Sequence, residues 1–414
     1  MKNIFYAQSG GVTSVINATA SAVIQTARQH SDKIGTVYAG YRGILGALNE
    51  ELIDTRHEPD TLVKALKHTP GGAFGSCRYK LKDLETSKQD YQRLIDVFSA
   101  HNIGYFLYNG GNDSQDTANK VSQMADTMGY DLKCIGIPKT MDNDLPYTDN
   151  CPGFGSVAKY VATSILEASM DIKSMQQSTQ VFILEVMGRH AGWVAAAGGV
   201  ASEQLPGVPH IILMPEVAFD QERFLQKVDE CVKQHGFCTI IASEGTKYAN
   251  GEFLSAQKTQ DAFGHQQLGG TAATLAEMVK QQLGYKQHHA IADYLQRSAR
   301  HIASQTDLDQ AYAVGQKAVE LALNGESGIM TTIERHNNNP YEWQVGSIPL
   351  NQVANVEKAL PNDFITEDGF HITDKAIEYF LPLIQGEAFP PFKNGLPDYV
   401  ELHNHRVAQK LAER

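Results

Sequence analysis

The chain is poor in cysteine and tryptophan, and it has no long apolar run. Its 414 residues include two tryptophans and five cysteines, namely Cys77, Cys134, Cys151, Cys231 and Cys238. The cysteine count is odd and no pair has C-x-x-C spacing, which argues against a disulfide framework and for a reducing compartment. No segment approaches the roughly 18 apolar residues that cross a bilayer. The N-terminal residues enter a strand-like segment without a secretory signal. We therefore expect a soluble, cytoplasmic protein with no membrane partner.

Basic residues are not in excess. The 35 Lys and Arg are outnumbered by 47 Asp and Glu, so the net charge is −12. An acidic chain is a poor candidate for binding nucleic acid, and we expect no such partner. Phosphate ligands remain possible, because the electrostatic field of a pocket is local.

Short apolar runs alternate with amphipathic stretches along most of the chain. The strand-like runs end in Gly or a polar turn and cover residues 4–7, 36–38, 104–108, 134–137, 180–185, 210–214 and 239–243. The helix-like stretches cover residues 15–29, 90–102, 114–128, 157–174, 219–235 and 270–282. Strands that alternate with helices predict an α/β fold with a parallel sheet.

The length allows two or three domains. We predict one α/β domain over residues 1–150 and a second over 151–300. A C-terminal extension over 330–414 is expected to be helical in part, and part of 300–414 is expected to rejoin the first domain. No internal repeat or low-complexity linker marks the boundaries.

The stretch Ile137–Asp144 follows an apolar strand-like run and holds three groups suited to phosphate chemistry. Lys139 is a cation, Asp142 can accept a proton, and Asp144 can orient a neighbour or a metal-bound water. Parallel sheets present such groups to ligands at strand ends. Asp and Asn also favour simple capped turns, so the octapeptide by itself leaves both interpretations open.

Two glycine pairs follow other strand-like runs. They are Gly10 with Gly11, and Gly110 with Gly111. Glycine lets backbone N–H groups approach an anion closely at a helix N-terminus, although a plain strand-to-helix turn also uses glycine. After the second pair, Asn112 and Asp113 supply oxygen atoms of the kind Mg²⁺ binds, and Ser114 is a candidate helix cap.

Further polar residues end other segments. Arg78 closes a glycine-rich loop and is either a phosphate clamp or an exposed structural arginine. Arg189 and His190 follow a strand-like run. Both are candidates to face a ligand. The alternative for Arg189 is a buried ion pair, and for His190 we favour the alternative of a hydrogen-bonded core histidine. Three more candidates for sugar or phosphate contacts are Glu244, Tyr294 and Arg297.

These motifs, in this order, resemble the phosphofructokinase superfamily over residues 2–325. The most specific matches are Pro138–Asp144, which reads Pro-x-Thr-x-Asp-Asn-Asp, and Met187-Gly-Arg189. The resemblance implies phosphoryl transfer to the 1-hydroxyl of fructose 6-phosphate. It also implies two Rossmann-like parallel-sheet domains with the active site in the cleft between them, the first for the phosphoryl donor and the second for the sugar.

Two sequence positions indicate which phosphoryl donor the protein uses. ATP-using members resemble Gly-Gly-Asp-Gly-Ser and Pro-Gly-Thr, whereas this chain has Gly-Gly-Asn-Asp-Ser and Pro-Lys-Thr. Asp113 and Lys139 therefore resemble the pyrophosphate-dependent branch. A carboxylate at Asp113 would lie where the α-phosphate of ATP must lie, and two like charges ~4 Å apart cost about 4 kcal/mol at an effective dielectric of about 20. Lys139 would offset charge on the transferring and leaving phosphates.

The resemblance also implies residue roles. Asp142 is the expected general base, with the weak basicity of an ordinary Asp of pKa ~3.9. The expected catalytic set is completed by Lys139, Asp113, Thr140 and Asp144. The expected fructose 6-phosphate contacts are Thr140, Met141, Asp142, Met187, Gly188, Arg189, Glu244, Tyr294 and Arg297, with Arg297 on the 6-phosphate. The expected pyrophosphate contacts are Gly11, Arg78, Gly110, Gly111 and Lys139, and Asn112 is expected to face Mg²⁺.

Some positions depart from the family pattern. Asn112 stands where most members have Asp, so we expect weaker or water-mediated metal contact. Gln180 stands where bacterial ATP enzymes carry an Arg that reaches a neighbouring subunit. A homodimer or homotetramer is still expected, and the extension would shape an interface or cover the cleft. The alternatives left open are ATP as donor, sedoheptulose 7-phosphate as acceptor, and a non-catalytic subunit that senses sugar phosphates.

Overall fold

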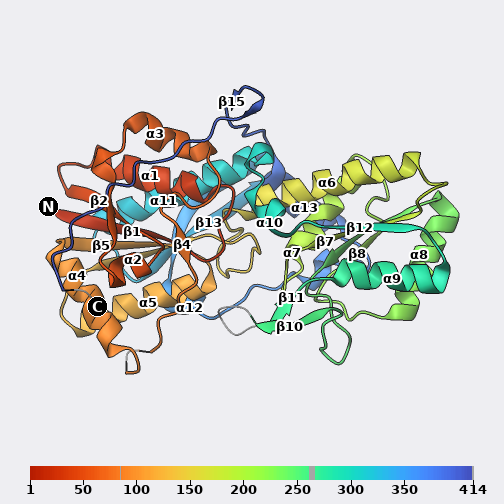
Figure 1. The fold of residues 1–414 in the computed structure, drawn as a ribbon, viewed down its shortest axis with the longest axis horizontal. Coiled ribbons are helices and arrows are strands. Elements are labelled where there is room, and N and C mark those ends of the chain that lie inside the picture. The colour runs from red at the N-terminus through yellow and green to blue at the C-terminus, as the bar shows by residue number, and fades with distance from the viewer. Residues whose placement is uncertain (84, 261–265, 413–414) are drawn as a thin grey trace.

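The computed structural model describes residues 1–83, 85–260 and 266–412, and it contains two sheets made mostly of parallel strands (Figure 1). The first has the order β14-β13-β6-β5-β1-β2-β3, and β4 pairs with β1. Its strands are β1 Lys2–Ser9, β2 Ile34–Gly40, β3 Leu52–Asp54, β4 Ser76–Cys77, β5 Ile103–Gly110, β6 Lys133–Pro138, β13 Ile329–Asn338 and β14 Tyr341–Pro349. The second sheet has the order β12-β7-β9-β8, with β7 Val181–Val186, β8 Ile211–Leu213, β9 Cys238–Ser243 and β12 Gln287–Ile291.

Helices cover both faces of the first sheet, because its central strands are apolar on both sides. Along β1, Ile4 and Tyr6 pack toward α1 and α11, whereas Phe5 and Ala7 pack toward α4 and α5. Around the first sheet the helices are α1 Ile16–Gln29, α2 Leu45–Leu48, α3 Asp60–Ala65, α4 Lys88–Ala100, α5 Asn112–Thr127, α11 Gln305–Leu323 and α12 Leu350–Val353. The others are α6 Phe154–Ser174, α7 Trp193–Ala197, α8 Gln221–His235, α9 Thr271–Leu283, α10 Asp293–Ser298 and α13 Asp374–Phe380. Two small hairpins, β10 Ala256–Gln260 with β11 Gln266–Leu268 and β15 Phe392–Lys393 with β16 Leu396–Pro397, lie outside the main sheets.

The predicted α/β class with two parallel sheets is confirmed, and every predicted strand and helix is present within a few residues. No strand is predicted for the polar segment around Trp343, yet it belongs to the β13–β14 hairpin, which extends the first sheet beside β6. The long helix α11 was also missed. The domain boundaries at 150, 300 and 330 stay predictions. In the described part of the chain, no helix has the length and apolarity needed to cross a membrane.

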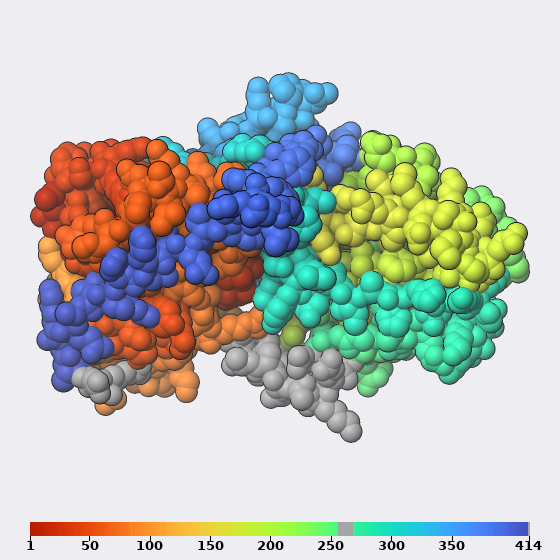
Figure 2. Space-filling view, turned by 45° about the horizontal axis from the view of Figure 1, so that its top comes forward, coloured from red at the N-terminus to blue at the C-terminus, as the bar shows by residue number. Residues whose placement is uncertain are grey.

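Residues 400–411 run over the lobe built on the first sheet, within the dark blue segment in Figure 2. Their backbone N–H groups bond that lobe repeatedly: His403 and Asn404 donate to the Glu58 carboxylate, and Val407 donates to the Leu52 carbonyl at 2.9 Å. The C-terminal extension is therefore part of the folded body, and its only regular helices are α12 and α13 among the residues described.

Candidate active site

A cavity of about 360 Å³ lies between the carboxyl ends of the two sheets. The pairing of β5 with β6 places the residues of its first wall side by side. Gly110 pairs with Pro138, and the Lys139 N–H donates to the Gly110 carbonyl at 3.1 Å. The cavity brings together these predicted residues: Gly11, Arg78, Gly111, Asn112, Asp113, Lys139, Thr140, Met141, Asp142, Asp144, Met187, Arg189, Glu244, Tyr294 and Arg297. Gly110 and Gly188 are not in its lining.

Asp142 lies in the base loop, which we define as residues 139–151 between β6 and α6. Its N–H donates to the Thr140 hydroxyl at 3.1 Å. Burial, followed by the charges of Asp144 and Glu244, raises the pKa of Asp142 to about 7, and Lys139 opposes this rise. Burial also raises the pKa of Asp144. Asp142 thus differs from the ordinary Asp expected from sequence, and it suits a proton acceptor that works near neutral pH.

Three cations, which we call the cation cluster, gather around Gly11: Lys139, Arg78 and Arg297. The Lys139 ammonium donates to the Gly11 carbonyl at 2.5 Å. A Cβ placed on Gly11 would lie 2.5 Å from Arg297 Nη1 and 3.9 Å from Arg78 Nη2. Burial lowers the pKa of Lys139 to about 8, with smaller contributions from the two arginines. Cations this close together repel one another, so the site favours an anionic ligand.

Arg297 reaches across the cavity. It comes from α10 beside the second sheet, and its guanidinium lies 3.9 Å from the Tyr294 ring centroid. Its Nη1 also closely approaches Gly11 of the first lobe. Sequence resemblance implied a role on the sugar 6-phosphate, and that role stays a prediction.

The first residues of α5 are held by neighbours that the sequence did not indicate. Asp113 Oδ1 forms an ion pair with Lys80 at 2.7 Å. The Asn112 side chain accepts from the Asn355 N–H at 2.7 Å and donates to the Val356 carbonyl. The prediction that Ser114 caps the helix is wrong, because Gly111 is the N-cap residue and Ser114 lies in the first turn of α5.

The second wall of the cavity follows β7 and β9. Glu244 Oε1 accepts from the Gly188 N–H at 3.5 Å, and burial raises the pKa of Glu244. Gly188 has φ +139, a backbone conformation that favours glycine. The Met187 N–H donates to Gln296 Oε1 at 3.3 Å, which ties the end of β7 to α10.

His190 and Glu357 form the rim between the two walls. The prediction of a core histidine is wrong: the His190 side chain is 54% exposed, and its Nδ1 lies 3.5 Å from the Glu357 carboxylate. Glu357 belongs to the C-terminal extension and was missed, as were Ser9, Tyr79 and Lys80. No local sequence signal marks Glu357, since only the path of the extension brings it to the cavity.

A magnesium ion fits these residues if it arrives with a phosphate ligand. The Asp144 Oδ1 atom is buried and has no hydrogen-bond partner among the described residues. Across residues 1–83, 85–260 and 266–412, no group of three or more His, Cys, Asp or Glu side chains is arranged to hold a metal. Mg²⁺ is commonly held by one or two carboxylates together with substrate phosphate oxygens, which matches this donor set.

Comparison with known proteins places these observations in a family. The phosphofructokinase family model matches residues 3–322. The pyrophosphate--fructose 6-phosphate 1-phosphotransferase of Halomonas elongata is 61% identical over 412 residues, covering 99% of this chain and 98% of that protein. The crystal structure of a pyrophosphate-dependent phosphofructokinase from Marinobacter aquaeolei is 58% identical, has a TM-score of 0.92, and covers 100% of this chain and 99% of that one. Its counterpart from Nitrosospira multiformis is 57% identical with a TM-score of 0.93, over 100% of this chain and 99% of that one. The chain therefore belongs to the phosphofructokinase family.

Proposed function

We propose that the protein transfers a phosphoryl group reversibly from pyrophosphate to the 1-hydroxyl of fructose 6-phosphate, which yields fructose 1,6-bisphosphate and phosphate. One observation carries the proposal: a single cavity holds a carboxylate with a near-neutral pKa, Asp142, and the cation cluster. The relatives named above, similar over nearly their whole length, carry names with the same donor. A reversible reaction of this kind would serve both glycolysis and gluconeogenesis.

The main polar residues of the cavity then have chemical tasks. Asp142 removes the proton of the sugar 1-hydroxyl, and Lys139 with Arg78 stabilises negative charge on the transferring phosphoryl group and on the phosphate that leaves. Asp144 is the best-placed carboxylate for Mg²⁺, which would supply further charge neutralisation on the phosphate oxygens. Asn112 already bonds Asn355 and Val356, so it contributes at most one remaining lone pair to that ion. The sugar contacts are those expected from the family: Met187, Arg189, Glu244, Tyr294 and Arg297.

Exclusion of ATP rests on Asp113 and Lys139. The Lys80 ammonium, 2.7 Å from Asp113, offsets part of the negative charge that would repel the α-phosphate. Charge repulsion therefore weakens ATP binding less than the charge of Asp113 alone would. The volume of the Asp113 and Lys139 side chains provides the rest of the discrimination against ATP.

The decisive experiment is a comparison of donors with the purified full chain, fructose 6-phosphate and Mg²⁺. We expect fructose 1,6-bisphosphate with pyrophosphate and none with ATP. Product with ATP alone would be consistent with Asp142 as the base but would show that pyrophosphate is not the donor. Absence of product with either donor, but turnover with sedoheptulose 7-phosphate, would change the acceptor.

We expect a bell-shaped pH dependence of kcat/KM. Asp142 acts in its deprotonated form, so the rate should fall about tenfold per pH unit below about 7. Lys139 acts as a cation, so the rate for pyrophosphate should fall above about 8. The profile is measured with correction for ionisation of the substrates. An acid limb below about pH 5 would show that Asp142 keeps the pKa of an ordinary Asp.

Gly11→Ala should displace Arg297, because the new Cβ would lie 2.5 Å from Arg297 Nη1. We expect KM for fructose 6-phosphate to rise about tenfold, because Arg297 is a proposed contact of the sugar 6-phosphate. Gly111→Ala is the matched control, since its nearest neighbour is the Lys139 carbonyl at 3.6 Å. Equal effects of the two variants would show that crowding of Arg297 is not the cause.

We also propose that the protein assembles as a homo-oligomer through the β12 edge of the second sheet. Ile291 and Leu295 next to this edge are 49% and 64% exposed. Large exposed apolar side chains that cluster commonly mark an interface. Light scattering on the full chain, compared with Leu295→Glu, tests this, and a monomeric wild-type protein would contradict it.

A further inference from the structure

The base loop contains backbone conformations that need outside support. Asn143, next to Asp142, has φ +55, and Tyr147 has φ +62. A left-handed conformation is unfavourable for Tyr, although Asn tolerates it, and it persists where the surroundings hold it. The Asn143 side chain accepts from the Cys151 N–H at 2.9 Å, which closes the loop on itself.

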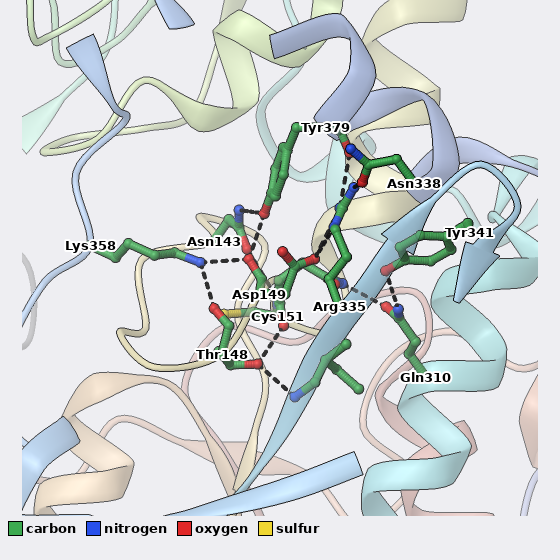
Figure 3. A network of polar contacts seen from close by, with 12 residues as sticks. Asn143, Thr148, Asp149, Cys151, Gln310, Arg335, Asn338, Tyr341, Lys358 and Tyr379 are labelled. Carbon is green, nitrogen blue, oxygen red and sulfur yellow. Dashed lines mark hydrogen bonds and ion pairs between the residues drawn. The ribbon is translucent and has the colours of Figure 1, made fainter. Parts of the chain in front are cut away.

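Lys358 holds this loop from outside (Figure 3). Its N–H donates to the Asp144 carbonyl at 2.7 Å. Its ammonium donates to the carbonyls of Thr148 and Asp149 at 3.0 and 2.9 Å. Lys358 thus clamps both ends of the turn between Asp144 and Asp149.

Tyr379 and Arg335 hold the same loop from another side (Figure 3). The Tyr379 hydroxyl accepts from the Asn143 amide at 3.0 Å and donates to the Asp149 carbonyl at 2.6 Å. Arg335 Nε donates to the Asp149 carboxylate at 3.0 Å. The external contacts of the loop therefore come largely from β13 and the extension, far along the chain.

The segment 355–358 also reaches both walls of the cavity. On the first wall, Asn355 and Val356 bond the Asn112 side chain at the start of α5. On the second, the Trp193 indole N–H donates to the Lys358 carbonyl at 2.8 Å. One short segment thus links the donor side, the base loop and the sugar side.

We propose that Lys358 and Tyr379 are positioning residues that hold Asp142 in reach of the acceptor hydroxyl, an inference that rests on the proposed function. Neither residue lines the cavity. Among the described residues, Lys358 forms no ion pair with a carboxylate, so its hydrogen bonds go to the turn itself. Displacement of a reacting group by about 1 Å can cost about a hundredfold in rate.

Lys358→Met removes the two ammonium bonds to Thr148 and Asp149, leaves the backbone bond to Asp144 in place, and keeps the aliphatic length of the side chain. We expect kcat to fall about a hundredfold while KM for both substrates stays within about threefold, because Arg189, Arg297 and Arg78 lie outside the loop. Lys375→Met is the matched control, since Lys375 lies on the same extension and pairs with Asp363 at the surface. It should retain wild-type kcat.

Tyr379→Phe is the conservative second variant, because it keeps the ring packed against Trp193 and Phe380 and removes only the hydroxyl. We expect kcat to fall at least about tenfold, and the double variant to lose less than the product of the single losses because both residues hold one loop. Amide hydrogen exchange of residues 139–151 should become faster in Lys358→Met and in Tyr379→Phe, and it should be unchanged in Lys375→Met.

Three results would overturn the proposal. They are wild-type kcat in Tyr379→Phe, a loss confined to KM, and unchanged exchange in the loop. The wild-type assay with pyrophosphate separates this outcome from failure of the proposed function. Hydrogen exchange reports on the loop whichever phosphoryl donor the enzyme uses.

Discussion

Asp142→Asn should lower kcat about 10³-fold in both directions, the range found when a general base is lost. The amide has nearly the same shape, but it cannot accept the proton of the sugar hydroxyl. Fructose 6-phosphate should still bind with nearly unchanged affinity, because Met187, Arg189 and Arg297 are intact. Turnover is measured in steady state, and sugar-phosphate affinity by calorimetry without pyrophosphate.

The matched control for Asp142→Asn is Asp32→Asn, at an exposed position after α1. It carries the same chemical change and should be fully active. Retained turnover in Asp142→Asn would remove Asp142 from the base role and leave Asp144 as the nearest candidate carboxylate. Parallel loss of turnover and sugar binding would instead indicate that the cavity has collapsed.

Lys139→Met should lower kcat/KM for pyrophosphate about 10³-fold, because a preorganised cation at the transferring phosphate is lost. Methionine fills most of the space of the lysine stem, so the loss reports on charge. A second readout follows from the contact with Asp142. The Lys139 charge lowers the pKa of Asp142, so its removal should move the acid limb of the pH profile to higher pH.

Lys133→Met is the control for Lys139→Met, because Lys133 begins the same strand, β6, and pairs with Asp131 at 3.1 Å away from the cavity. It should leave turnover and the pH profile unchanged. An acid limb that stays in place in Lys139→Met would contradict close electrostatic contact between Lys139 and Asp142. A small loss of kcat/KM would transfer the main role in donor binding to Arg78.

The positions of most site residues were predictable because parallel α/β folds place ligand groups directly after strands. Lys139, Asp142, Met187 and Glu244 each follow a strand by a few residues, so a local pattern was enough to find them. Glu357 and Lys358 follow no such pattern. They reach the site through packing of segments far apart in the chain, and a local motif carries no information about that packing.

Errors in local interpretation have the same origin. His190 was expected in the core because histidine beside an apolar strand is commonly buried, yet the turn after β7 leaves it at the rim beside Glu357. The polar segment around Trp343 contains few long apolar runs. It becomes a strand pair because β6 offers an open edge to β13.

The sequence by itself determined the family, the two parallel sheets, the chemical groups at the strand ends and the type of phosphoryl donor they suit. These follow from strand and helix periodicity and from motifs within a few residues of one another. Only the tertiary structure decided the pKa of Asp142, the convergence of three cations on Gly11 and the support of the base loop by the extension. Those properties depend on burial and on distances between segments that folding brings together.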